Sequence, residues 1–216
     1  MAIRPSGREP REAPGPPSGS VAGVIPAAGS STRMGRPKAL LDAGGRSFLA
    51  ATVGALVGGG CRPVAVILGE DRHEEERKAT AAGAVALINP DPGDGPITSI
   101  RVALGALEED VEGIAVLPVD HPLVRPESVR ALVDAFLEGD APVALPTHRG
   151  KRGHPGLFRR SVFPELLDPG LEGGARTVVH AHLADAALVE VDDPGVLADI
   201  DTPEAYRAAF PGSPAP

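Results

Sequence analysis

Short, continuously apolar runs alternate along the chain with longer stretches of mixed polarity. Apolar runs without a polar residue at every second position are typical of parallel strands that are buried on both faces. Strands are therefore predicted at residues 21–25, 63–68, 84–88, 113–119 and 142–145, with a less regular one at 187–191.

The stretches between these runs have helical spacing. In the segment 125–137, Val129, Leu132, Val133 and Phe136 recur at i, i+3, i+4 and i+7, which places them on one helix face. Helices are predicted at 47–57, 71–82, 98–108 and 125–137, and with less regular patterns at 159–167 and 175–183. An extended segment at 152–158 is expected to return the chain toward the functional site. The alternation predicts an α/β fold, a single open, mostly parallel, Rossmann-like sheet flanked by helices.

Composition changes this picture mainly at the two ends. The chain holds 27 glycines and 24 prolines among 216 residues, a share at which disorder becomes a reasonable hypothesis. The first twenty residues contain five prolines and very few apolar side chains, so they cannot bury enough surface to offset their ordering entropy. We predict disordered tails at 1–20 and 211–216 and one folded domain at 21–210.

Charge and cysteine content exclude several classes of protein. A net charge of -8 argues against a general nucleic-acid-binding protein, which needs a basic face. The single cysteine, Cys61, excludes an intramolecular disulfide framework. No apolar run approaches the roughly 20 residues that span a bilayer, and no apolar signal segment stands near residue 1. A cytoplasmic protein that acts without a membrane is expected, and its oligomeric state is not predicted.

The loop after the first predicted strand carries the strongest chemical signal. A glycine-containing turn that leaves a buried strand exposes backbone N–H groups to phosphate oxygens, and Arg33 and Lys38 add positive charge there. Two common phosphate motifs do not fit. Five residues separate Gly29 from Gly35, so the Walker A spacing fails, and Ala27 stands where the dinucleotide motif needs its first glycine.

The pattern A-A-G-x-S-x-R-M-G-x-x-K over residues 27–38 resembles the molybdenum cofactor cytidylyltransferases and the related guanylyltransferase-like NTP transferases. The resemblance implies a fold of the nucleotide-diphospho-sugar transferase type. It also implies catalytic roles for Arg33 and Lys38. The nucleotide-binding residues that it implies here are Ala27, Ala28, Gly29, Ser30, Ser31, Arg33, Gly35 and Lys38.

Two acidic segments are candidates for a Mg²⁺ site. Asp120 follows the fourth predicted strand, where side chains face the ligand crevice of an open α/β sheet. The family's Asp-x-Pro and Asp-Thr-Pro-Glu motifs match here, so the resemblance implies Asp120 and Asp201 as metal ligands, with Asp199 as the fallback. We expect Asp199 and Asp201 to point to opposite faces of one extended segment, so that only one addresses a given metal. The alternative interpretations are a helix N-cap at Asp120 and a helix start at Thr202.

Weaker matches complete the candidate site. The family resemblance places Gly95 and Ser99 near the base and ribose, although a helix N-cap at Thr98 or Ser99 explains this segment equally well. It places His154, in an R-G-H-P segment, and Arg176 on the acceptor side, where either can instead be structural. His121 is given no ligand role. His180 and His182 are interpreted as part of a solvated helix face rather than a metal site.

The resemblance therefore implies a Mg²⁺-dependent nucleotidyltransferase. It moves a nucleoside monophosphate from an NTP to a phosphorylated small-molecule acceptor and releases pyrophosphate. The Ala-Ala-Gly sequence favours CTP, and molybdopterin is the acceptor that the family implies. Three alternatives stay open: GTP as donor, another acceptor such as a sugar 1-phosphate, and a non-catalytic nucleotide-binding accessory protein. A dinucleotide-dependent oxidoreductase is disfavoured by the failed glycine motif.

Overall fold

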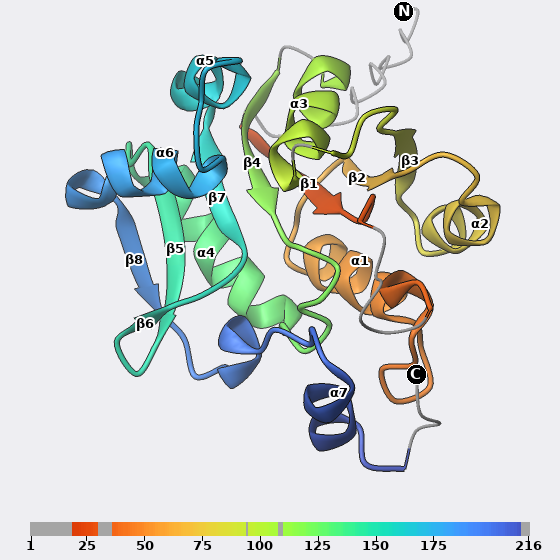
Figure 1. The fold of residues 1–216 in the computed structure, drawn as a ribbon. Coiled ribbons are helices and arrows are strands. Elements are labelled where there is room, and N and C mark those ends of the chain that lie inside the picture. The colour runs from red at the N-terminus through yellow and green to blue at the C-terminus, as the bar shows by residue number, and fades with distance from the viewer. Residues whose placement is uncertain (1–18, 30–35, 94, 108–109, 213–216) are drawn as a thin grey trace, which may run out of the picture.

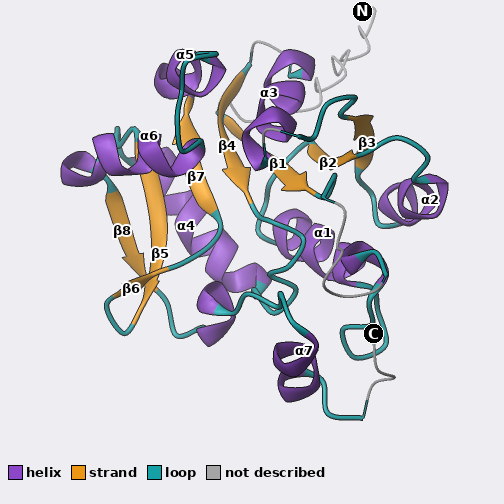
Figure 2. Ribbon diagram, viewed as in Figure 1, coloured by secondary structure: helices purple, strands orange, loops and turns teal. Residues whose placement is uncertain are grey.

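The computed structural model describes residues 19–29, 36–93, 95–107 and 110–212. Helices cover both faces of a twisted sheet (Figures 1 and 2). The strands are β1 (Ser20–Pro26), β2 (Val64–Leu68), β3 (Val85–Ile88), β4 (Val111–Val116), β5 (Val143–His148), β6 (Lys151–Arg152), β7 (Gly156–Arg159) and β8 (Ala187–Glu190). The helices are α1 (Phe48–Gly58), α2 (His73–Ala81), α3 (Pro96–Ala106), α4 (Pro126–Glu138), α5 (Phe163–Leu167), α6 (Ala175–Ala181) and α7 (Pro203–Ala209).

The sheet confirms the predicted fold class, with an antiparallel insertion. Its order is β3-β2-β1-β4-β7-β5-β6, and β8 pairs with β5 off this path. Strands β1 to β4 are parallel to their neighbours within this group, and β8 is parallel to β5. Strand β7 runs antiparallel to both β4 and β5. The extended segment predicted near residue 152 therefore returns to the middle of the sheet.

The helix predicted at 159–167 is partly wrong. Arg159 is the last residue of β7, residues 160–162 form a 3-10 turn, and only Phe163–Leu167 is α-helical. The guanidinium of Arg159 donates hydrogen bonds to the carbonyls of Phe136 (2.5 Å) and Gly139 (2.7 Å), beyond the end of the strand. Pairing of Arg159 with Gly113 of β4 thus keeps this residue in the strand, and the helix begins later than the apolar spacing predicts.

The core lies on the two faces of the sheet. Alternate residues of β1 take opposite sides: Val21 and Ile25 pack with α1, α4 and α7, whereas Ala22 and Val24 pack with α3, α5 and α6. The strands are buried on both faces, which explains their uninterrupted apolar composition. For helix α7 the sequence predicted only a helix start at Thr202. The Thr202 hydroxyl caps this helix by accepting a hydrogen bond from the backbone N–H of Ala205 (3.2 Å).

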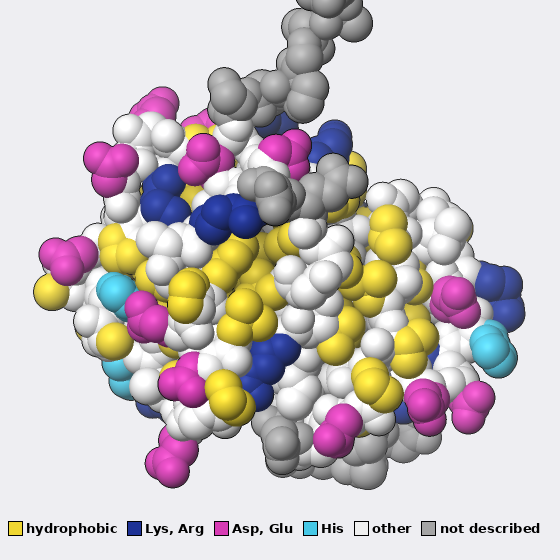
Figure 3. All heavy atoms as spheres, turned by 90° about the horizontal axis from the view of Figure 1, so that it is seen from above, with side chains coloured by type: hydrophobic (Ala, Val, Ile, Leu, Met, Phe, Trp, Pro, Cys, Tyr) yellow, Lys and Arg dark blue, Asp and Glu magenta, His cyan; other side chains and the backbone are white. Residues whose placement is uncertain are grey.

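The surface of the described residues includes a few large apolar side chains on edge strands, among them Val85, Ile88 and Leu188. Figure 3 looks onto the end of the molecule where α3 and α5 lie, and hydrophobic side chains gather across the middle of this face with Lys and Arg side chains among them. Across the described part of the chain, none of the helices combines the length and apolar character that crossing a membrane requires. The predicted tails lie outside the described residues except for four positions, and Ser20 already belongs to β1.

Candidate active site

The first part of the phosphate-loop motif leaves the sheet at the end of β1. The backbone N–H of Ala27 still donates to the Ile67 carbonyl of β2 (2.8 Å). Gly29 is exposed, and no atom of the described structure lies within 4 Å of the place where its Cβ would be. A ligand can therefore approach this backbone closely. Ser30, Ser31, Arg33 and Gly35 lie outside the described residues.

A cavity of about 370 Å³ opens beside this loop. The strand order reverses at β1, with β2 on one side of it and β4 on the other. The cavity lies at this switch point, which is the usual ligand crevice of an open α/β sheet. Its volume is in the range of small-molecule sites. The structure brings together in its lining the described members of the predicted nucleotide and metal set: Ala27, Ala28, Gly29, Lys38, Gly95, Ser99, Asp120 and Asp201.

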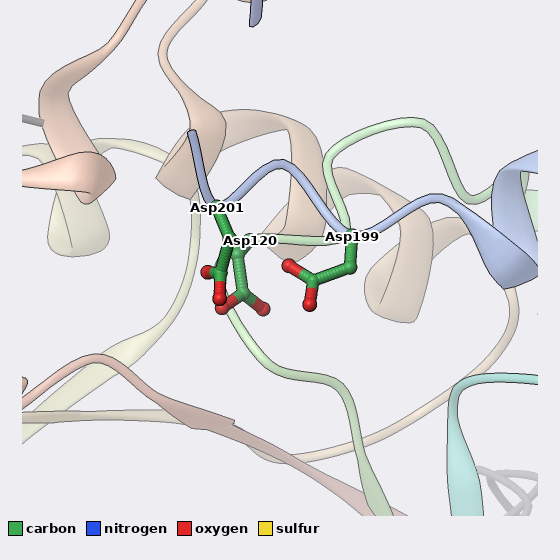
Figure 4. Close-up of side chains that lie close together, drawn as sticks. All are labelled: Asp120, Asp199 and Asp201. Atoms are coloured by element: carbon green, nitrogen blue, oxygen red, sulfur yellow. The ribbon is translucent and has the colours of Figure 1, made fainter. Parts of the chain in front are cut away.

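Three carboxylates, the acidic triad, come together here, and Figure 4 shows them side by side. Two of them, Asp120 and Asp201, line the cavity. Asp120, Asp199 and Asp201 each offer an oxygen, and these oxygens lie within 4.8 Å of one another. The expectation that Asp199 and Asp201 diverge is wrong, because residues two apart on an extended segment lie on the same side. The backbone N–H of Ile200, between them, donates to the Asp120 carbonyl (2.9 Å) and holds the two loops together. Asp120 is not a helix N-cap, since α4 begins six residues later.

Lys38 lies among these carboxylates. Its Nζ donates to Asp120 Oδ2 (3.3 Å) and to Asp201 Oδ1. Burial alone would raise the pKa of Asp120, but the hydrogen bond and charge of His121, together with Lys38, lower it to about 2. Burial and the neighbouring Asp120 and Asp201 charges raise the pKa of Asp199. Asp120 is therefore ionised more firmly than Asp199.

His121 supports Asp120 from the far side. Its Nδ1 lies 3.0 Å from Asp120 Oδ1, and its ring meets the ring of His154 nearly edge-on at a centroid distance of 4.4 Å. Burial, followed by the His121 charge, lowers the pKa of His154 to about 4, so His154 is neutral near pH 7. Its Nδ1 is buried and has no hydrogen-bond partner within the described structure. The position of His121 next to Asp120 in the loop was the signal that sequence reasoning passed over.

A second cavity of about 370 Å³ lies on the other side of His154. Both predicted acceptor residues, His154 and Arg176, line it, together with Arg152 and His180. Its apolar walls include Val116, Leu145, Phe158 and Val179. His180 is exposed, as predicted, although it borders this cavity, and His182 instead pairs with Glu165 (2.7 Å).

The segment around Gly95 forms the far wall of the first cavity. Helix α3 begins at Pro96 with Gly95 as its N-cap at φ 83°, a conformation that favours glycine. The alternative interpretation, in which Thr98 or Ser99 is the N-cap, is therefore wrong. Instead Asn89 Nδ2 donates to the hydroxyls of Thr98 (2.8 Å) and Ser99 (3.2 Å) and fixes both side chains.

Sequence reasoning missed Arg72 and Glu75 on the same wall. They form an ion pair (3.2 Å) at the start of α2. Their position a few residues after β2, at the edge of the sheet where Gly29 and Asp120 also lie, could have indicated them.

An open α/β sheet with a phosphate-type loop and clustered carboxylates at its switch point defines a nucleotide-binding class of protein. The chain belongs to the family of the MobA-like NTP transferase domain, whose model matches residues 23–187. It is therefore an NTP transferase. The match ends before Asp199 and Asp201.

Individual relatives cover almost the whole chain. The probable molybdenum cofactor guanylyltransferase of Mycolicibacterium paratuberculosis is 30% identical over 192 residues, covering 87% of this chain and 94% of the relative. The molybdenum cofactor cytidylyltransferase of Escherichia coli is 26% identical over 188 residues, covering 86% and 93%. The crystal structure of Rv0371C from Mycobacterium tuberculosis in complex with manganese has a TM-score of 0.75 and 27% identity, covering 89% of this chain and 99% of that chain.

Proposed function

We propose that this protein transfers a nucleoside monophosphate from an NTP, with CTP as the first candidate, to a phosphorylated acceptor, with molybdopterin as the first candidate. The observation that carries the proposal is that His121 links Asp120, in the lining of the first cavity, to His154, in the lining of the second. A group held in the second cavity is thereby close to the phosphates of a nucleotide held in the first.

The triad fits a hard divalent cation. Mg²⁺ and Mn²⁺ prefer carboxylate oxygens, and a site with few protein ligands suits Mg²⁺ because substrate phosphates complete its coordination. Asp120 and Asp201 are the proposed ligands, and Asp199 lies close enough to be a third. A bound Mg²⁺ supplies charge neutralisation and a template for the phosphates. The relative whose structure holds manganese supports a metal-dependent reaction.

The chain's own residues then position two anions that repel each other, the triphosphate of the NTP and the phosphate of the acceptor. The open backbone at Gly29 receives the triphosphate, and Arg33 and Lys38 bring positive charge to it. An acceptor phosphate oxygen forms a bond to the α-phosphorus in line with the bond to the β-phosphate, which breaks and releases pyrophosphate. Lys38 lies at the edge of the cavity where negative charge grows in this step, so its ammonium stabilises the transition state.

The second cavity suits an acceptor with an anionic group and an apolar or aromatic body. Arg176 and Arg152 supply charge for the anion, and Phe158, Leu145 and Val116 supply the apolar wall. His154 is neutral, so it serves this site through hydrogen bonding rather than through charge. The names of both curated relatives, which act on the molybdenum cofactor, support molybdopterin as acceptor.

The donor base has two candidates. The Ala27-Ala28-Gly29 sequence and the cytidylyltransferase relative support CTP, and the guanylyltransferase relative at 30% identity supports GTP. The experiment is a panel of the four NTPs with Mg²⁺ and a pyrophosphate readout, with and without molybdopterin. We expect release with CTP only when the acceptor is present. A preference for GTP would overturn the cytidylyl assignment. Thermal stabilisation by nucleotide without pyrophosphate, for molybdopterin and for sugar 1-phosphates alike, would indicate a non-catalytic binding protein.

A further inference from the structure

The segment that carries Asp199 and Asp201 runs outside the sheet, so other contacts must hold it against Asp120. It begins after β8, forms a 3-10 turn at Pro194–Leu197 and continues extended to α7. Two glycines allow it to lie close to its neighbours. A Cβ on Gly195 would stand 2.1 Å from the Leu123 carbonyl oxygen, and a Cβ on Gly153 would stand 2.3 Å from the Val196 carbonyl oxygen. The segment is thus enclosed by backbone on both sides.

Asp193 stands at the start of this segment and is 1% exposed. Its Oδ2 accepts hydrogen bonds from the backbone N–H of Arg125 (2.9 Å) and from the hydroxyl of Ser128 (2.8 Å). Its Oδ1 accepts from the backbone N–H of Gly195 (2.9 Å), and the Arg125 Nε lies 3.7 Å away. One buried carboxylate therefore joins the start of the segment to the first turn of α4, through bonds strengthened by its charge.

These contacts affect the acidic triad because the loop that carries Asp120 ends at Arg125, the N-cap of α4. This loop and the segment that carries Asp199 and Asp201 are joined at two points. Asp193 joins them at Arg125, and the hydrogen bond from the Ile200 N–H to the Asp120 carbonyl joins them beside the carboxylates. Among the described residues, the remaining ties between the two loops would be the contact beside the carboxylates, the glycine packing, the Lys38 bridge between Asp120 and Asp201, and the Arg125 side-chain bond to the Asp192 carbonyl. None of these is a hydrogen bond from the start of the segment to the backbone and Ser128 of the first turn of α4, which Asp193 alone supplies.

We propose that Asp193 is a positioning residue that sets the spacing of the Asp120, Asp199 and Asp201 carboxylates and so the affinity of their metal site. The inference rests on the proposed metal-dependent function. Loss of a residue that orients metal ligands typically costs 10- to 100-fold in metal affinity. A residue that only capped α4 would instead change the stability of the fold and leave the affinity of the folded protein for metal unchanged.

The test measures Mn²⁺ binding to the full chain by isothermal titration calorimetry without nucleotide. Asp193→Asn keeps the shape of the side chain and removes its charge. In Asp193→Ser the shorter side chain still accepts from the Gly195 N–H but cannot reach Arg125 and Ser128. This variant therefore removes the contacts to α4 and keeps the hydrogen bond within the turn. The matched control is Ser128→Ala, which removes one hydrogen bond to the same carboxylate and leaves the Arg125 and Gly195 contacts in place.

We expect the Mn²⁺ dissociation constant to rise 10- to 100-fold in Asp193→Ser and in Asp193→Asn, at a temperature where circular dichroism shows each protein folded. Ser128→Ala should lower the melting temperature and keep the dissociation constant within about twofold. A folded Asp193→Ser protein with wild-type Mn²⁺ affinity overturns the positioning role and leaves the proposed function standing. Failure of the wild-type protein to bind Mn²⁺ overturns the metal site itself, and the inference with it.

Discussion

Replacing Lys38 with alanine should have opposite effects on metal binding and on turnover. The Lys38 ammonium lies 3.3 Å from Asp120 Oδ2 and also contacts Asp201 Oδ1, the carboxylates proposed to hold the cation. At 3.3 Å the Coulomb attraction of two unit charges is about 1.3 kcal/mol in water and about 5 kcal/mol at an effective dielectric constant of 20. The Lys38 and Asp120 side chains are only 16% and 23% exposed. Burial disfavours the charged ammonium and offsets part of this attraction, so the net interaction falls in the lower part of the range.

A cation that displaces this ammonium must overcome a cost on the order of 1.4 kcal/mol, which corresponds to a tenfold change in affinity. We therefore expect Lys38→Ala to bind Mn²⁺ about tenfold more tightly than the wild type when no nucleotide is present. With nucleotide and acceptor, the same variant should lose about 10²- to 10³-fold in turnover, because the ammonium no longer stabilises the transferring phosphate.

Calorimetric Mn²⁺ titration and pyrophosphate release measure the two effects on the same preparation. Lys78→Ala is the matched control, since it removes the same charge from an exposed site where Lys78 Nζ lies 3.9 Å from Glu74. This control should leave both quantities unchanged. Unaltered or weaker Mn²⁺ binding by a folded Lys38→Ala protein would refute the idea that the lysine and the metal compete for the same carboxylates.

Three further predictions concern the two cavities. Asp120→Asn should fold and lose about 10²- to 10³-fold in turnover, and near-wild-type pyrophosphate release would rule out the metal assignment. Arg176→Ala should raise the KM for the acceptor at least tenfold and leave the KM for the NTP unchanged, and an equal rise in both would place Arg176 outside the acceptor site. The pKa of His154 is about 4 in the folded protein and near 6.5 when unfolded, so the unfolded state takes up a proton first as the pH falls from 6.5 to 4. The free energy of unfolding should decrease over that range by up to about 3 kcal/mol, and urea unfolding of His154→Gln at pH 5 and pH 7 should show a smaller decrease than the wild type.

The sequence allowed the parallel part of the fold to be predicted, because strands buried on both faces need continuous apolar runs. Val64–Leu68 is buried at every position and was recognised from its composition alone. The sequence also indicated part of the first cavity. It placed Gly29 in the loop after the first strand and Asp120 at the ligand crevice of an open sheet, and both residues line this cavity.

The features that sequence reasoning missed depend on long-range packing. The sequence predicted an extended segment at 152–158, but its local pattern does not record that β7 pairs antiparallel with both β4 and β5. The contact between Lys38 and Asp201 joins residues 163 positions apart. Asp193 has an ordinary sequence context, and its contacts form only where α4 and the segment after β8 come together. The divergence expected of Asp199 and Asp201 failed for a simpler reason, since the twofold repeat of an extended chain places them on the same side.

The measurement that tests the proposed transfer to molybdopterin most directly is mass spectrometry of the acceptor after incubation with protein, Mg²⁺, CTP and molybdopterin. The predicted result is an acceptor heavier by one cytidylyl group, formed in step with pyrophosphate and absent from reactions with EDTA or with Asp120→Asn. Unmodified acceptor in every reaction, including those with GTP, ATP or UTP, from a protein that calorimetry shows to bind both nucleotide and acceptor, would contradict nucleotidyl transfer to this acceptor.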